Sequence, residues 1–378
     1  MNQQFMRFKS SFIKDREMWC VPMSINWLFK INLNDWSIEN VCDLGSDDTY
    51  HIDYIYLYKN VVWCVTSTGV KVIGYHMLTG KIEHFYLPGE EYRRNRGTVL
   101  LGGKLWILPI ELPGKMIAFD MEKKSFTIHE SWEKECLKWK VTGRAKSFCN
   151  VKSIIYLSLP NECKIIKYDL EEEMMNVKQL PGQYGLWCIF LAQSNIFVTS
   201  SVKRMLFQWD EKTDEIKRYD CPYQMDKPYA RGMEIKDEIL LIDDKAIDIL
   251  NIETGEISPY DKISIKLKAH YDSASTLPLF YDFVKYHTKY FLMPWFADCL
   301  LEFNGERKEW TGHILKISDD LFFREYVVKR MNANNLNDEG VLFVKGFIKY
   351  VLTVCNMEGK QELNKRIGYE IYKNILMN

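Results

Sequence analysis

The chain has 378 residues, of which 47% are hydrophobic and 14% aromatic, and its formal net charge is −1. This composition excludes an intrinsically disordered protein, which combines low hydrophobicity with high net charge. The balance of 50 basic against 51 acidic residues argues against a nucleic-acid partner, since proteins that bind duplex DNA carry a basic excess or stripe.

The start of the chain and its cysteines indicate a cellular compartment. Residues 1–15 contain no apolar segment long enough for a signal peptide, and no window reaches 18 apolar residues, so we expect a cytoplasmic location and no membrane partner. The 10 cysteines are scattered and form no CxxC pair, which predicts reduced thiols. We expect neither a metal nor a cofactor.

A pattern of two strands recurs seven times along the chain. Its first copy reads EMWCVP (17–22) and LFKINLNDWSIE (28–39). The first strand of each copy holds a large apolar residue, namely Trp19, Trp63, Trp106, Tyr156, Phe197, Leu240 and Phe291. A polar residue closes the second strand 11 to 14 residues later, namely Asn32, His76, Asp120, Asp169, Asp210, Asn251 and Asn304. Such a residue can cap the following turn with its own side chain.

Each copy predicts a four-stranded antiparallel sheet. One apolar strand precedes the aromatic strand, as in YIYLY (54–58), and another follows the turn, as in KIEHFYL (81–87). Four strands in about 45 residues are typical of a β-propeller blade. We therefore predict an all-β propeller of seven blades, with six or eight as alternatives. The blades are expected near 12–45, 54–87, 97–130, 147–180, 188–221, 232–262 and 281–315.

Two short motifs connect this pattern to known repeat proteins. The glycine doublet of kelch repeats occurs once, at Gly102 and Gly103, and the WD dipeptide occurs once, at Trp209 and Asp210. The chain thus resembles kelch-like and WD-like β-propellers over about residues 5–315. The resemblance implies a divergent member of these propellers and assigns the chain to no particular family among them.

Two segments fall outside the repeat. In 131–142, Trp132, Cys136 and Trp139 have helical spacing, which predicts a surface helix packed where blades 3 and 4 meet, with a partner-binding site as the alternative. After the propeller domain (1–315), residues 316–378 are expected to form a C-terminal extension with amphipathic α-helices, since apolar residues recur every fourth position from Leu363 to Ile375. This extension would either dock on the propeller or bind a partner.

Arginine recurs in the segments that lead into the innermost strands. Arg96, Arg144 and Arg231 are each followed by a small residue, which would let the backbones approach closely at the propeller axis. Three arginines around one channel would form an anion-binding funnel. Tyr184 and Tyr229 could add hydrogen bonds or stacking. The alternative is that these arginines bridge neighbouring blades through acidic residues.

The sequence leaves two functions open. It contains no GxSxG, HExxH, P-loop or GxGxxG motif. The preferred hypothesis is a non-catalytic binding or scaffold protein that presents its funnel to a peptide, a protein partner or an anionic small molecule. The second is a lyase or hydrolase acting on a sugar- or peptide-derived anion, with His51 as acid–base residue; streptogramin-type lyases supply an analogy of fold. The high Lys, Asn, Ile and Met content indicates an AT-rich bacterial genome.

Overall fold

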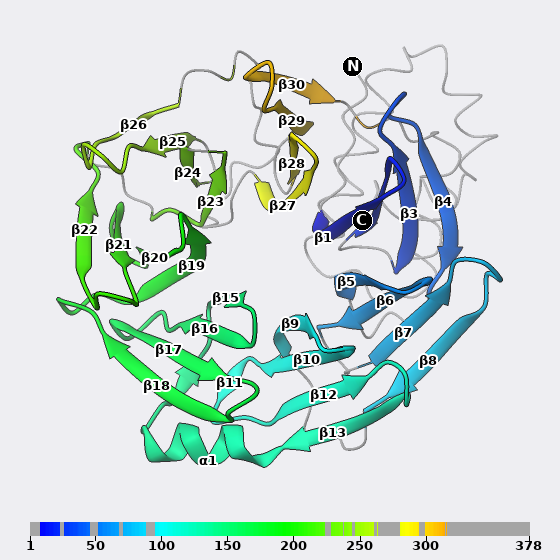
Figure 1. Ribbon diagram of the computed structural model, residues 1–378, viewed down its shortest axis with the longest axis horizontal. Helices are drawn as coiled ribbons and strands as arrows, with labels where there is room; N and C mark the ends of the chain where they lie inside the picture. Colours follow the sequence, from blue (N-terminus) through cyan, green and yellow to red (C-terminus); the bar gives the residue numbers. More distant parts are fainter. Residues whose placement is uncertain are drawn as a thin grey trace, which may run out of the picture. The chain divides into compact units, whose positions relative to one another are not determined.

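The propeller predicted from the repeat is present. The computed structural model describes residues 8–22, 26–45, 52–67, 71–87, 95–223, 228–236, 238–243, 246–260, 263, 280–294, 299–313 and 315. Within these ranges, seven four-stranded antiparallel sheets follow one another around a ring (Figure 1). The seven-bladed fold is therefore confirmed, whereas the expected extension at 316–378 lies outside the described residues.

Each blade is built from one continuous stretch of chain. Blades 1 to 4 consist of β1 (Phe8–Lys14), β2 (Glu17–Pro22), β3 (Trp27–Asn32) and β4 (Ile38–Asp43); β5 (Ile52–Tyr58), β6 (Val61–Thr66), β7 (Lys71–His76) and β8 (Ile82–Tyr86); β9 (Asn95–Leu101), β10 (Lys104–Pro109), β12 (Met116–Asp120) and β13 (Ser125–His129); and β15 (Ser147–Val151), β16 (Ile154–Ser158), β17 (Lys164–Asp169) and β18 (Met174–Gln179). Blades 5 to 7 consist of β19 (Leu186–Ala192), β20 (Asn195–Ser200), β21 (Met205–Trp209) and β22 (Ile216–Asp220); β23 (Arg231–Ile235), β24 (Glu238–Ile242), β25 (Ile247–Leu250) and β26 (Ile257–Pro259); and β27 (Phe280–Tyr286), β28 (Lys289–Pro294), β29 (Leu300–Asn304) and β30 (Glu309–His313).

The two repeated positions have the roles that the sequence predicts. All seven large apolar residues of the second strands are buried. Six of the seven polar residues accept a hydrogen bond from the backbone N–H two residues further on, at 2.8 to 3.0 Å, and so close the turn; these are Asn32, Asp120, Asp169, Asp210, Asn251 and Asn304. His76 differs, since its Nε2 lies 2.8 Å from Glu83 Oε2.

The innermost strand of each blade contacts its neighbours around the axis (Figure 1). Small residues allow this approach: a Cβ atom on Gly97 of β9 would lie 1.9 Å from Phe148 of β15, and one on Gly232 of β23 would lie 2.1 Å from Phe190 of β19. At these two positions the glycine after the arginine leaves room for an aromatic side chain of the neighbouring blade.

Blades 1 and 7 close the ring without exchanging a strand among those described. Near the axis, the backbone N–H and hydroxyl of Ser11 in β1 donate to Asp282 Oδ2 in β27, at 3.0 and 3.2 Å. At the outer edge, Trp36 in the turn after β3 stacks on His313 of β30, with ring centroids 3.5 Å apart. Among the described residues, the first and last blades are thus joined by non-covalent contacts and not by a shared strand.

One helix is described, and it lies where the sequence predicts it. The helix α1 (Glu130–Lys138) contacts β12 of blade 3 and β18 of blade 4, and buries Trp132 and Cys136. Trp139, which follows it, is 40% exposed. Beside it, β11 (Glu111–Leu112) pairs with β14 (Gly143–Arg144) as a separate two-stranded sheet.

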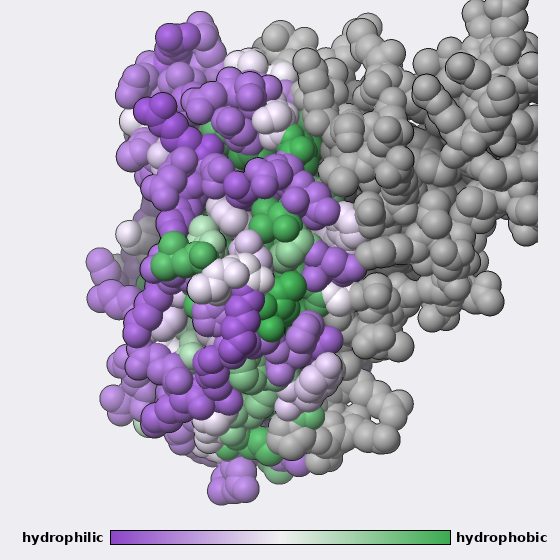
Figure 2. Space-filling view, turned by 90° about the vertical axis from the view of Figure 1, so that its right-hand side faces the viewer, coloured by the Kyte–Doolittle hydropathy of each residue, from purple (hydrophilic) through white to green (hydrophobic). Residues whose placement is uncertain are grey.

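The flank of the propeller shown in Figure 2 is mainly hydrophilic. The flank that faces the viewer in Figure 2, on the side of blades 1 and 2 in Figure 1, shows hydrophobic side chains interspersed among hydrophilic ones. Leu78 and Tyr86 of blade 2 are among the exposed large apolar residues. In the described part of the chain, no helix has the length and hydrophobicity needed to cross a bilayer.

Candidate functional site

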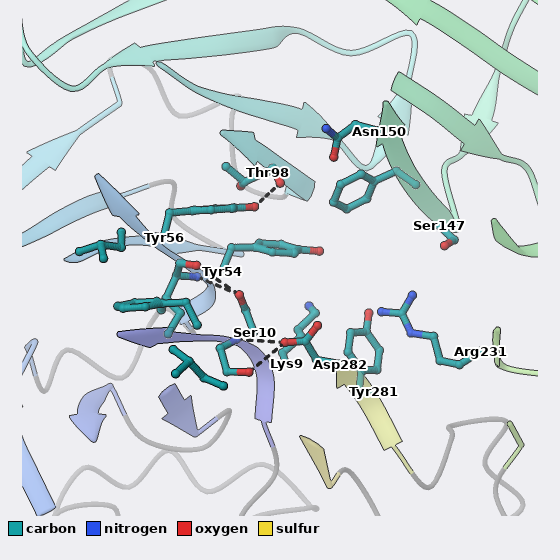
Figure 3. A pocket seen from close by; sticks show the side chains of 16 residues that line it. Lys9, Ser10, Tyr54, Tyr56, Thr98, Ser147, Asn150, Arg231, Tyr281 and Asp282 are labelled. Atoms are coloured by element: carbon teal, nitrogen blue, oxygen red, sulfur yellow. Dashed lines mark hydrogen bonds between the residues drawn. The ribbon is translucent and has the colours of Figure 1, made fainter. Parts of the chain in front are cut away.

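A cavity of about 440 Å³ lies among the innermost strands. Residues of β1, β5, β9, β15, β23 and β27 line it, so that six of the seven blades contribute (Figure 3). Its charged and aromatic lining comes from Lys9, Tyr54, Tyr56, Phe148, Arg231, Tyr281 and Asp282. Polar and aromatic groups from many blades therefore converge at the axis, which is the usual arrangement of a ligand site.

Bulges at the beginning of three innermost strands deliver part of this lining. In β1, Lys9 and Ser10 lie between the paired positions Phe8 and Ser11. The register also shifts in β5 between Ile52 and Tyr54, around Asp53, and in β27 between Phe280 and Asp282, around Tyr281. Bulges redirect side chains and are common next to functional sites. Here they bring Lys9, Asp53 and Tyr281 into one cluster.

Lys9 and Asp53 form an ion pair between blades 1 and 2. The Lys9 ammonium also lies 5.5 Å from the ring centroid of Tyr54 and 6.0 Å from that of Tyr281. Burial alone lowers the pKa of Lys9, but Tyr54, Asp53 and Tyr281 together outweigh burial and leave this pKa above its usual value. Lys9 is therefore a charged group whose countercharge is already supplied by Asp53.

Arg231 has a different environment. Its guanidinium carbon lies 4.0 Å from the ring centroid of Tyr281, and its Nη1 lies 4.0 Å from Cys188 Sγ (Figure 3). Its Nε is buried and has no hydrogen-bond partner, and no carboxylate forms an ion pair with it within the described residues. A guanidinium in such a place can bind a carboxylate or phosphate through two parallel hydrogen bonds.

Asp282 is the acidic group next to this cation. Burial raises the pKa of Asp282 to about 6, because the charged form loses its hydration, while Arg231 and the hydrogen bonds from Ser11 oppose that shift. The carboxyl thus changes its charge close to neutral pH. It can hold or release a proton within the cavity as conditions change.

Two neutral groups of blades 3 and 4 complete the lining. Thr98 Oγ1 of β9 is buried without a hydrogen-bond partner, although the Thr98 carbonyl accepts a hydrogen bond from the Tyr56 hydroxyl. Asn150 of β15 also faces the cavity (Figure 3). Buried polar groups are normally paired, so an unpaired hydroxyl on the wall of a cavity points to a ligand or a bound water.

The structure places the residues singled out in the sequence in several environments. Arg231 lines the cavity. Arg144 lies instead on β14 of the separate two-stranded sheet, where its Nε is 3.0 Å from Glu111 Oε1 and its side chain is 55% exposed. Arg144 therefore does not join Arg231 at the axis, because the chain reaches β15 only three residues later. Arg96 belongs to β9, but its side chain is not among those described, and His51 lies outside the described residues.

The two tyrosines also lie away from the cavity. The Tyr229 hydroxyl donates to Asp248 Oδ2 at 2.5 Å inside the contact between blades 5 and 6. Tyr184 lies beneath two cations, Lys203 at 5.5 Å and Arg218 at 5.8 Å from its ring centroid. Both tyrosines therefore pack within or between blades and do not line the axial cavity.

Sequence reasoning missed one arginine that does bridge two blades. Arg204, in the turn before β21, pairs with Asp243 and with Asp248, whose Oδ2 lies 2.9 Å from its Nη1. All three side chains are at most 4% exposed. Arg204 thus forms between blades 5 and 6 the kind of bridge that the sequence allowed for Arg96, Arg144 and Arg231.

Metal binding finds no support in the described ranges, where no group of three or more His, Cys, Asp or Glu side chains could hold an ion. No family model matches the sequence. No curated protein matches it either.

Solved structures resemble the fold. A streptogramin B lyase has a TM-score of 0.58 at 10% identity, over 83% of this chain and 95% of the lyase. YCF48 bound to the D1 peptide has a TM-score of 0.60 at 11% identity, and the match covers 79% of this chain and 91% of YCF48. The extracellular domain of the one-component system BT4673 from B. thetaiotaomicron has a TM-score of 0.57 at 12% identity, over 83% of this chain and 46% of that protein. Such identities establish a shared propeller fold and no more.

Proposed function

We propose that this protein is a non-catalytic binding protein whose axial cavity holds an anionic group of a peptide, a protein partner or a small molecule. The observation that carries the proposal is Arg231, a guanidinium inside the cavity with an unbonded Nε and no paired carboxylate in the described chain. An unpaired buried charge is unfavourable, so an anion entering from solvent would relieve it.

Comparison with other propellers is consistent with this role. YCF48 was solved with a bound peptide. A peptide whose terminal or side-chain carboxylate reaches Arg231 would use the same chemistry as a small carboxylate. The peptide would then be recognised at the propeller axis, and the flank shown in Figure 2 would not contact it.

The test is a thermal-shift and calorimetric screen of carboxylates and of peptides with free C-termini against the full chain. Wild type should bind members of both sets, and Arg231→Gln should lose this binding. Arg144→Gln removes an exposed arginine far from the cavity and should bind as wild type does. Equal binding by all three proteins would contradict the proposal.

A catalytic role is a second candidate, favoured by Asp282. A carboxyl group with a pKa of about 6 beside a bound anion could act as general acid or base. The ligands found in the screen should be followed by NMR during long incubation with the protein. A product that forms with wild type and not with Asp282→Asn would establish an enzyme, and an unchanged ligand would establish binding.

A further inference from the structure

We infer that the ligand of the axial cavity is a hydroxylated monocarboxylate of the size of a single sugar acid. Its carboxylate would bind Arg231, and its hydroxyl groups would reach Thr98 and Asn150. This inference rests on the proposed function, because it names the ligand class of the same cavity.

The charges of the cavity favour one negative charge and not two. Lys9 is neutralised by Asp53, which leaves Arg231 as the cation without a paired carboxylate in the described chain. Asp282 lies close enough to Arg231 to be influenced by its charge. A second negative charge on the ligand would therefore be repelled by Asp282, which disfavours phosphate esters and dicarboxylates.

The opposite wall favours hydroxyl groups on the ligand. Thr98 Oγ1 is buried and has no hydrogen-bond partner, and Asn150, an exposed residue, supplies an amide to the same lining. Blade 3, which carries Thr98, lies across the ring from blade 6, which carries Arg231, whereas blade 4, which carries Asn150, is separated from blade 6 by blade 5 (Figure 1). A ligand that satisfies both sides needs a carboxylate at one end and hydroxyl groups at the other.

The remaining lining suits the ring of a sugar. Tyr54, Phe148 and Tyr281 add aromatic surface to the lining, and the ring centroids of Tyr54 and Phe148 lie 6.1 Å apart. Aromatic rings provide apolar contact with a polar edge, which matches a molecule that has both C–H faces and hydroxyl groups. The volume of about 440 Å³ falls within the range of ordinary small-molecule sites, about 300–1,000 Å³.

Three matched probes test the inference by titration calorimetry on the full chain. D-glucuronate has a carboxylate and hydroxyl groups, cyclohexanecarboxylate has a similar ring without hydroxyl groups, and D-glucose has no carboxylate. D-galacturonate and D-gluconate extend the first class. At least one sugar acid should bind about tenfold more tightly than both comparison probes, since each well-placed hydrogen bond adds about that factor.

Two variants locate the contacts. Thr98→Val keeps the shape of the side chain and removes the unpaired hydroxyl, so it should weaken sugar-acid binding about tenfold and leave cyclohexanecarboxylate binding unchanged. Arg231→Gln should abolish the binding of both acids, with Arg144→Gln as the control. Thr98→Val keeps the test decisive even if Arg231→Gln does not fold.

The outcomes separate this inference from the proposed function. If cyclohexanecarboxylate or a peptide binds through Arg231 as tightly as every sugar acid, the sugar-acid inference is wrong and the binding function stands. If Thr98→Val does not weaken sugar-acid binding, the assigned orientation is wrong. If no carboxylate or peptide binds in a manner that depends on Arg231, the inference and the proposed function both fail.

Discussion

Ser11 donates two hydrogen bonds to a single oxygen of Asp282, a residue 271 positions further along the chain. This contact joins the innermost strands of the first and last blades, and the same carboxyl group lines the axial cavity. Ring closure and the candidate site therefore share one side chain, and a change at Asp282 should affect both.

The stability of the protein should depend on pH through Asp282. The folded protein raises the pKa of this carboxyl from 3.8 to about 6, so between these values the folded state holds a proton that the unfolded state releases. The stabilisation of the folded state by this group is fully present below the lower pKa and is lost as pH rises to about 6. The free energy of unfolding falls by at most about 3 kcal/mol over this range. Asp282→Asn should flatten this part of the profile.

Chemical unfolding of wild type and Asp282→Asn between pH 4 and pH 7 measures the difference. An Asn side chain can still accept from Ser11, so the variant should fold. A difference in free energy of unfolding that stays constant across this window would show that Asp282 does not titrate there.

Carboxylate binding should strengthen as pH falls. Above pH 6 Asp282 is ionised and offsets the net charge of the cavity without forming an ion pair with Arg231, and its protonation leaves the cavity with a net positive charge. The affinity for a carboxylate that stays ionised should rise by about tenfold between pH 7 and pH 5. Calorimetry with Asp282→Asn should give an affinity that is independent of pH over this interval.

Two arginine ion pairs offer a matched comparison of buried and exposed bridges. Arg204→Met leaves Asp243 and Asp248 buried without their cation, and should lower the free energy of unfolding by about 3–5 kcal/mol. Arg144→Met breaks a pair whose two side chains are more than half exposed, and should change it by less than about 1 kcal/mol. Urea denaturation measures the free energy of unfolding of both variants. Similar decreases for the two would mean that Arg204 does not bridge the blades as described.

The stack of Trp36 on His313 should matter for the contact between blades 1 and 7. Trp36→Ala removes this stack and a further contact with Phe291, and should lower the free energy of unfolding by about 1–3 kcal/mol. Trp139→Ala removes a tryptophan that is 40% exposed and should cost less. Equal effects of the two substitutions in thermal and urea unfolding would argue against a closing role for Trp36.

Each side chain that caps a turn should contribute modestly to the free energy of unfolding. Asn251 Oδ1 accepts from the backbone N–H groups of Glu253 and Thr254 at 3.0 and 3.1 Å. Asn251→Ala should lower the free energy of unfolding by about 1 kcal/mol, whereas Asn251→Asp, which keeps the acceptor, should preserve it. If the Asp variant loses as much as the Ala variant, the side chain does not stabilise the turn through this acceptor.

The repeat predicts the blades well because every blade contains the same hairpin, with one buried residue and one residue that caps the turn. Its buried residue and its turn-capping residue lie within one hairpin, so their spacing is fixed by local geometry and is visible in the sequence. Asp169 and Asp210 illustrate this, as each closes the turn that its position in the repeat implies. The helix at Trp132 is visible for the same reason.

The cavity could not be predicted in the same way. One extra residue in a strand reverses the faces of all residues beyond it, and nothing in the sequence around Lys9, Asp53 or Tyr281 marks the bulges. The small residue that follows Arg231 drew attention to it, but the same pattern also selects Arg144, which lies in a two-stranded sheet that the repeat does not contain. The two carboxylate partners of Arg204 lie in another blade, which no local pattern reveals.

The way the ring closes has a consequence for folding. Every neighbouring pair of described blades is joined by the chain itself except the first and the last, which meet through non-covalent contacts such as those of Ser11 with Asp282 and of Trp36 with His313. Closing so long a loop has an entropic cost that the contacts within a blade do not have. The ring therefore has one seam, and transient opening of the molecule should begin there, directly beside the axial cavity.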